Sequence, residues 1–202
     1  MFAVEGRPVL AHESALDMTL LRSTLLVLLL GLVVQVPGAH AQESVFGSEV
    51  VEPGIEFTFI AAPTDAVRPT PQHLPEDQTD IHLEVLAGWS EAISDEVGAP
   101  AGGFVPYLHL FATVTNEETG QRQKVSLVPH INRSDNAHYA RNVALPGAPD
   151  DSYTITFAVH PPQKFELATH RDWREAYGDT LFEPTTVTYE GLQLEEVAAA
   201  TR

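Results

Sequence analysis

The sequence predicts an all-β fold, specifically an immunoglobulin-like β-sandwich. Three observations support this prediction. About seven short segments alternate apolar and polar residues, clusters of turn-forming residues separate them, and no long amphipathic helix interrupts them. Because no motif repeats at a fixed period, the sequence does not indicate a propeller or a solenoid.

Residues 1–41 are predicted to be an N-terminal extension followed by a secretory signal peptide. Arg22 provides a basic start, a mostly apolar run follows it, and Ala39 and Ala41 have the spacing of a cleavage site. Met18 is then the expected start of translation. The apolar run is too short to span a bilayer, so we expect a periplasmic protein that is not membrane-spanning.

Residues 42–202 are predicted to form one metal-binding β-sandwich domain. The whole chain has 28 acidic and 11 basic residues and a formal charge of −17. Such a surface repels nucleic acid and attracts cations, although it would equally keep a protein soluble in a salty habitat. The chain has no cysteine, so any metal site must use imidazole and carboxylate groups, which suit Cu(II), Zn, Ni or Fe.

The first predicted strand covers residues 55–60, where apolar side chains alternate with other residues. Residues 61–78 follow and contain four prolines, which exclude a helix or a central strand. We interpret this segment as an extended connector over the surface. Its histidine, His73, is expected to be solvated.

The second predicted strand, residues 79–87, carries the first candidate ligands. Its core face would hold Ile81, Leu83 and Val85. Side chains two residues apart on a strand project in the same direction, about 6.6–6.8 Å apart. His82 and Glu84 can therefore bind the same ion. The alternative is that both side chains face water, as polar residues on a strand usually do.

Residues 104–116 are predicted to form the next strand, with a core face of Leu108, Leu110, Ala112 and Val114. Its second face carries Tyr107, His109 and Phe111 and is too aromatic for open solvent, so a loop or another subunit should cover it. This face motivates the prediction of a homodimer. Glu117–Gly120 then predict a tight hairpin turn into a strand over residues 121–128.

Two histidines, His130 and His138, flank a short polar turn. The turn contains Asn132, Ser134 and Asp135, which favour a chain reversal. Such a reversal would bring the two imidazoles close to each other. Each imidazole can offer a neutral nitrogen to a metal. Histidine is often an ordinary surface or core residue, so this pair alone does not establish a site.

Further strands are predicted over residues 139–145, 153–159 and 185–194. The long excursion before the last strand contains His170, and residues 172–177 within it could form one or two helical turns. Residues 195–202 are predicted to be a frayed tail.

The sequence contains no nucleophile elbow, P-loop, dinucleotide-binding fingerprint or HExxH zinc motif. A hydrolase that uses a serine beside a histidine would need a third orienting group, and spacing does not identify one. These missing motifs leave an enzyme open, and the prediction that the protein is not an enzyme depends on the family resemblance that follows.

Four segments, in order, resemble a known family: TDIHLEVLAGW, FVPYLHLFATVTNEETGQ, LVPHINRSDNAHYARN and YTITFAVHPPQKF. They are similar to segments of the periplasmic iron-transport accessory proteins that act beside oxidase-type iron permeases. The resemblance covers residues 56–190. It implies a dimeric immunoglobulin-like sandwich that binds copper and assists iron uptake through a permease of the inner membrane.

The resemblance also implies a ligand set for copper as Cu2+, namely His82, Glu84, His138 and His170. The family has a methionine directly after the proline at position 129, where this chain has His130, so His130 is predicted to be the fifth ligand. An imidazole in place of a thioether favours Cu(II). Asp135 is a candidate for a second, harder site for iron or manganese near Glu84. Buried, hydrogen-bonded roles are expected for His109 and His160.

The sequence thus predicts a periplasmic copper- and iron-binding protein that assists high-affinity iron uptake. One alternative is a periplasmic copper-buffering protein unrelated to iron. Another is a non-catalytic adhesion or carbohydrate-binding module whose histidines are incidental, and metal stoichiometry would distinguish this last class.

Overall fold

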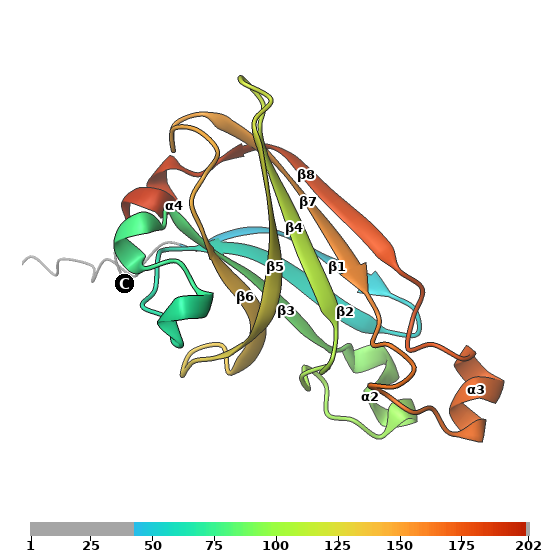
Figure 1. The fold of residues 1–202 in the computed structure, drawn as a ribbon. Coiled ribbons are helices and arrows are strands. Elements are labelled where there is room, and N and C mark those ends of the chain that lie inside the picture. Colours follow the sequence, from blue (N-terminus) through green and yellow to red (C-terminus); the bar gives the residue numbers. More distant parts are fainter. Residues whose placement is uncertain (1–42, 201–202) are drawn as a thin grey trace, which may run out of the picture. The chain divides into compact units, whose positions relative to one another are not determined.

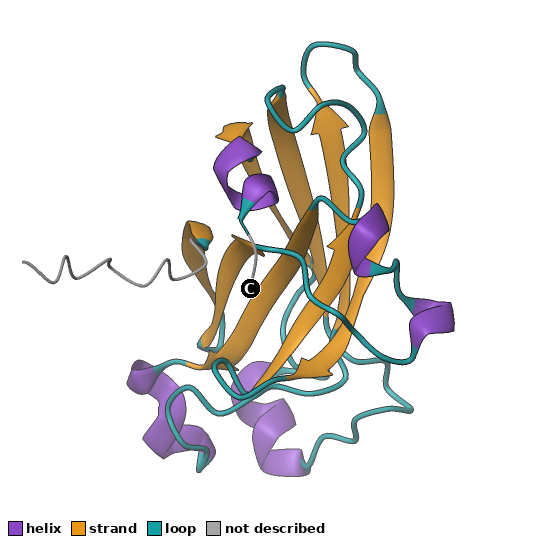
Figure 2. Cartoon of the chain, turned by 90° about the vertical axis from the view of Figure 1, so that its left-hand side faces the viewer, coloured by secondary structure: helices purple, strands orange, loops and turns teal. Residues whose placement is uncertain are grey.

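The computed structural model describes residues 43–200, which form an all-β domain (Figures 1 and 2). The predicted extension and signal peptide lie outside the described residues. The strands are β1 (Ser44–Val51), β2 (Ile55–Ala62), β3 (Ile81–Trp89), β4 (His109–Asn116), β5 (Arg122–Ile131), β6 (Ala137–Val143), β7 (Ser152–His160) and β8 (Thr185–Gln193). The helices are α2 (Glu91–Val97), α3 (Arg171–Tyr177) and α4 (Glu195–Ala199), with two 3-10 turns, η1 (Thr70–Gln72) and η2 (Glu76–Gln78).

The eight antiparallel strands form one continuous sheet in the order β1-β2-β3-β6-β5-β4-β7-β8. Strand β5 connects its two halves, because residues 122–127 pair with β4 and residues 128–131 pair with β6. The sheet curls until Phe46 of β1 contacts Tyr189 of β8, with ring centroids 5.7 Å apart. The all-β prediction is confirmed. The immunoglobulin-like sandwich is not confirmed, because the strands form a single, nearly closed, barrel-like sheet.

Alternate side chains of the strands point into the space that the curved sheet encloses. The core faces predicted for β3 and β4 are buried, and they include Ile81, Leu83, Val85, Leu110, Ala112 and Val114. Phe59 of β2 and Phe157 of β7 pack together across the interior, with ring centroids 4.6 Å apart. Burying a side chain of this size stabilises the fold by about 1.5–3 kcal/mol.

Strand β1 was not predicted from the sequence. A register shift between Val45 and Gly47 interrupts its alternation. Because β1 is an edge strand, Val45 and Val50 remain exposed, and the burial pattern has no clear period of two.

The C-terminal segment differs from its prediction as a frayed tail. Residues Glu195–Ala199 form α4, and Leu194 and Val197 are buried in the core, which anchors this helix. The helical turns predicted over residues 172–177 are confirmed by α3.

The two ends of the sheet carry different elements (Figure 1). Helices α2 and α3 lie at one end, where Trp89 at the end of β3 contacts Trp173 of α3, with ring centroids 6.2 Å apart. The proline-rich connector with η1 and η2 lies at the other end, beside the start of β3. Within residues 43–200, every helix is too short or too polar to cross a membrane.

Candidate metal centre

The outer face of β3, β6 and β5 carries most of the candidate ligands. The antiparallel register places His82 opposite Asn142 and His130 opposite His138. Paired residues, and residues two apart on one strand, point to the same face of a sheet, so these side chains form one patch together with Glu84. His82, Glu84 and His138 are at most 2% exposed. They therefore do not face water, although their face lies opposite the core.

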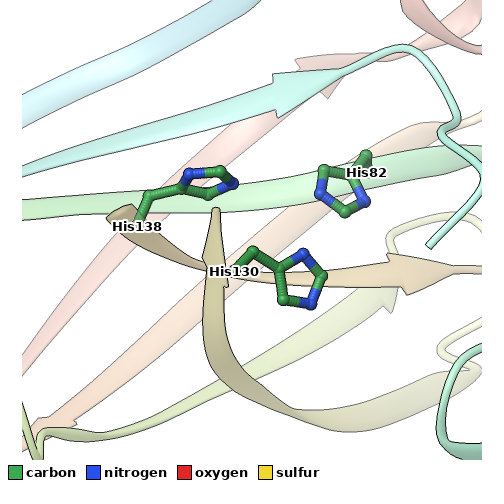
Figure 3. Close-up of side chains that lie close together, drawn as sticks. All are labelled: His82, His130 and His138. Carbon is green, nitrogen blue, oxygen red and sulfur yellow. The ribbon is translucent and has the colours of Figure 1, made fainter. Parts of the chain in front are cut away.

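Ring nitrogens of His82, His130 and His138 converge on one point. One nitrogen of each ring lies within 4.8 Å of the other two. The ring centroid of His130 lies 5.3 Å from that of His82 and 5.9 Å from that of His138. Figure 3 shows the three rings arranged around a common centre. The structure thus brings together three of the six predicted ligands.

Hydrogen bonds determine which nitrogen two of these rings present. Nδ1 of His82 lies 2.5 Å from Oδ1 of Asn142, and an amide oxygen only accepts, so Nδ1 donates its proton. Nδ1 of His138 donates in the same way to the backbone oxygen of Asn136, at 3.1 Å. Both rings are left with a lone pair on Nε2. Such bonds are the usual way in which proteins orient histidine ligands of metals.

His130 remains neutral over the physiological pH range. Burial is the largest cause that lowers its pKa, to about 3, and the nearby charges of His82, His73, His138 and Arg141 add to it. A protonated imidazole cannot bind a metal, so this lowered pKa keeps the ring available as a ligand.

Glu84 lies between the histidines and a group of acidic side chains. Its Oε1 is 3.7 Å from Nε2 of His82. Carboxylate oxygens of Glu43, Glu84 and Asp135 also lie within 4.8 Å of one another. Asp135 is fixed in the β5–β6 turn, where its Oδ2 accepts hydrogen bonds from two turn side chains at 2.7 and 2.9 Å. Glu43 was not among the predicted ligands. It directly precedes β1, and this strand was not predicted from the sequence.

His170 does not join this patch within one chain. It is exposed and precedes α3, whose Trp173 packs on Trp89. Trp89 is seven positions after His82 in β3, which corresponds to about 23 Å at 3.3 Å per residue. His170 precedes α3, which packs at the Trp89 end of β3, and it is not part of the group formed by the three converging histidines.

The other two histidines with predicted structural roles lie on the second half of the sheet. Nε2 of His109 is 2.7 Å from Oε2 of Glu166, so its hydrogen-bonded role is confirmed, but its side chain is 38% exposed rather than buried. His160 is partly buried and packs edge-on against Phe111, with ring centroids 6.1 Å apart.

His73 was expected to be solvated, and this prediction was wrong. It is 8% exposed, and its ring packs against His130 with centroids 4.9 Å apart. Both rings line a cavity of about 470 Å³ that also contains His82, His138 and Arg141. Sequence periodicity could not reveal this burial, because the connector between β2 and β3 contains only two short 3-10 turns and has no repeating pattern of buried positions.

The donor set fits a transition-metal ion. Three converging imidazoles, two of them with a defined lone pair on Nε2, suit Cu(II) or Zn(II), and Glu84 can add an oxygen ligand. Both methionines of the chain, Met1 and Met18, precede the domain, and there is no cysteine. The domain therefore has no sulfur ligand to stabilise Cu(I).

Comparisons with known proteins identify relatives of this chain. Residues 40–193 match the family described as "Fe2+ transport protein". A UPF0423 protein of Brucella abortus is 30% identical over 156 residues, which cover 76% of this chain and 82% of the relative.

Two solved structures are similar in fold and sequence. A copper-bound variant of FetP from uropathogenic Escherichia coli has 26% identity and a TM-score of 0.60, and the match covers 75% of this chain and 99% of FetP. A copper-bound variant of P19 from Campylobacter jejuni has 25% identity and a TM-score of 0.61, with 74% and 96% covered.

Proposed function

The chain belongs to the Fe2+ transport protein family, and on this basis we propose that it is a periplasmic metal-binding protein that assists iron uptake. In this proposal it binds copper and iron, catalyses no reaction, and delivers iron to a permease of the inner membrane. The copper-bound relatives FetP and P19 support the choice of copper.

The observation that carries the proposal is the convergence of His82, His130 and His138. A purely structural histidine can be satisfied by one hydrogen bond, so it does not explain why ring nitrogens of three histidines lie within 4.8 Å of one another. A metal binds the neutral form of an imidazole through its free lone pair, so three converging imidazoles can bind one ion together. We propose these three residues as copper ligands, with Glu84 as an oxygen ligand.

The acidic group beside the histidines is the proposed position for iron. Asp135 and Glu84 supply hard carboxylate oxygens, and Glu43 lies close enough to complete the group. Oxygen ligands suit ferrous iron or manganese better than they suit copper. The two proposed positions are adjacent, since Glu84 contributes to both.

His170 can contribute to the copper position only if a second copy of the chain supplies it, because it directly precedes α3, which lies at the Trp89 end of the sheet, away from the connector (Figure 1). We therefore propose a homodimer in which α3 of one subunit approaches the connector end of the other. The exposed Tyr107 and Phe165 at the α3 end provide apolar surface for such an interface.

A copper titration of the metal-free protein tests the proposal. The wild type should bind a first equivalent of Cu(II) tightly, and His138→Ala should weaken this binding at least tenfold. His160→Ala is the matched control, since it removes an imidazole outside the cavity, and it should bind like the wild type. Equal first-equivalent affinities of the wild type and His138→Ala, measured by isothermal titration calorimetry, would refute the proposed site.

A further inference from the structure

His73 is a buried histidine that the proposed copper ligands leave unused. It lies in the connector directly after η1, and its Nδ1 has no hydrogen-bond partner among residues 43–200. Leaving a buried polar atom unsatisfied costs about 1–3 kcal/mol. A ligand that binds this nitrogen would offset that cost.

The residues on both sides of His73 are fixed to β6. Arg141 donates a hydrogen bond from Nη1 to the backbone oxygen of Gln72. Asn142 donates from Nδ2 to the backbone oxygen of Leu74 at 2.9 Å. The connector therefore holds the imidazole of His73 in a defined place, although it lacks regular strand pairing.

The ring that His73 contacts has a buried nitrogen of its own without a partner. Nε2 of His130 makes no hydrogen bond within the described part of the chain. Figure 3 shows that one nitrogen of His130 faces His82 and His138, while Nε2 points away from both rings. Since one imidazole has two nitrogens on different sides, His130 can serve two positions.

We propose that His73 and Nε2 of His130 form a second position for a divalent transition-metal ion, next to the three-histidine position. The two rings approach to 4.9 Å between centroids, and each contributes a buried nitrogen without a partner. Both line the same cavity, so water molecules can complete the coordination of the ion. The inference rests on the proposed copper site, because His130 belongs to both positions.

The chemistry of His130 sets the order of filling. A neutral imidazole carries one lone pair, so a first ion at the nitrogen facing His82 leaves the proton on Nε2. A second ion at Nε2 would displace this proton to solvent, and His130 would then contribute one nitrogen to each ion. Imidazole nitrogens favour Cu(II) or Zn(II) at this second position.

The test is a titration of the metal-free full domain with two equivalents of Cu(II), followed by calorimetry and electron paramagnetic resonance. We expect two binding events in the wild type. The second should be weaker, should release a proton, and should change the copper signal through magnetic coupling of the two ions. His73→Ala and His73→Gln should leave the first event unchanged. The affinity of the second event should fall at least tenfold in both variants. His160→Ala should keep both events.

Variants of the first position separate this inference from the proposed function. His138→Ala should weaken the first event while copper still binds at His73 and His130, and adding His73→Ala should remove this second position and leave only the weakened first event. A single copper event in the wild type, or a second event that persists in both His73 variants, would overturn the inference and leave the first site intact. Thermal melting of each variant confirms that the domain is folded.

Discussion

Nδ1 of His82 donates a hydrogen bond to Oδ1 of Asn142, 2.5 Å away on the neighbouring strand β6. The same amide donates to the backbone oxygens of Asp65 and Leu74 in the connector, at 2.9 Å each. Asn142 therefore orients a proposed ligand and also holds the connector over the candidate metal centre.

Asn142→Ala is expected to weaken both functions. Copper affinity should fall about tenfold or more, because the orientation of His82 is lost. The free energy of unfolding should fall by about 1–3 kcal/mol, because two partly buried backbone oxygens lose their donor. Calorimetry and denaturant unfolding measure the two effects.

Asn142→Asp separates these two effects. Its carboxylate restores the acceptor for His82 but cannot donate to the connector, so copper affinity should recover while stability stays low. Wild-type copper affinity in Asn142→Ala would show that the hydrogen bond does not orient the ligand.

The strands that surround the site were predictable because their signal is local. Alternation over residues 79–87 placed His82 and Glu84 together on the face of β3 opposite the core. The turn-forming residues between His130 and His138 predicted a chain reversal that brings the two histidines together, and in the structure they are paired across β5 and β6. Such short-range patterns are encoded within each segment.

The features that the sequence did not reveal depend on long-range packing. His73 is buried because Arg141 and Asn142 hold the connector, more than 65 residues away in sequence. The single curled sheet depends on β5 changing partners between β4 and β6, and no periodicity marks this change. The position of His170 depends in the same way on how the α3 excursion packs on Trp89.

The stability of the metal-free protein should fall as the solution becomes acidic. The pKa of His130 is lowered to about 3 in the folded state, from 6.5 in the absence of burial, so the unfolded state binds the proton more readily between these values. Stability is therefore fully present above pH 6.5 and is lost progressively as the pH falls toward 3. Burial, followed by Arg141, also lowers the pKa of His73 and adds to this loss.

Between pH 7 and pH 5 the contribution of His130 should be about 1 kcal/mol. A shift over about 1.5 pH units corresponds to ~2 kcal/mol, which is halved here because the ring is only half-buried and solvent screens its charge. His130→Met removes the titrating group and should flatten this part of the profile. Identical pH profiles of the two proteins in urea unfolding would count against a His130 that stays neutral in the folded state.

Asp135→Asn tests the proposed iron position. The amide keeps an oxygen that can accept the hydrogen bond from Asn132, so the turn should persist, while the charge is lost. Binding of Mn2+ or Fe2+ should weaken about tenfold or more, and binding of the first Cu(II) should change little. An equal loss for both metals would mean that the two proposed positions are not separate.

A mixing experiment tests the proposed contribution of His170 from a second subunit. His170→Ala and His138→Ala should each weaken copper binding in their own homodimer. A mixed dimer has one position that lacks both histidines and one that lacks neither, so mixing should restore copper of wild-type affinity in about half of the positions of each mixed dimer. Sedimentation that shows a monomer at micromolar concentration with copper present would rule out this arrangement.

Growth under iron limitation tests most directly the claim that this metal centre serves iron uptake. A strain in which the gene is deleted should grow more slowly than the parent when iron is chelated, and equally well when iron is plentiful. Wild type and the control variant His160→Ala should restore growth under chelation, whereas His138→Ala should not. Equal growth of the deleted strain and the parent under chelation would contradict a role in iron uptake and would favour a copper-buffering function for the same site.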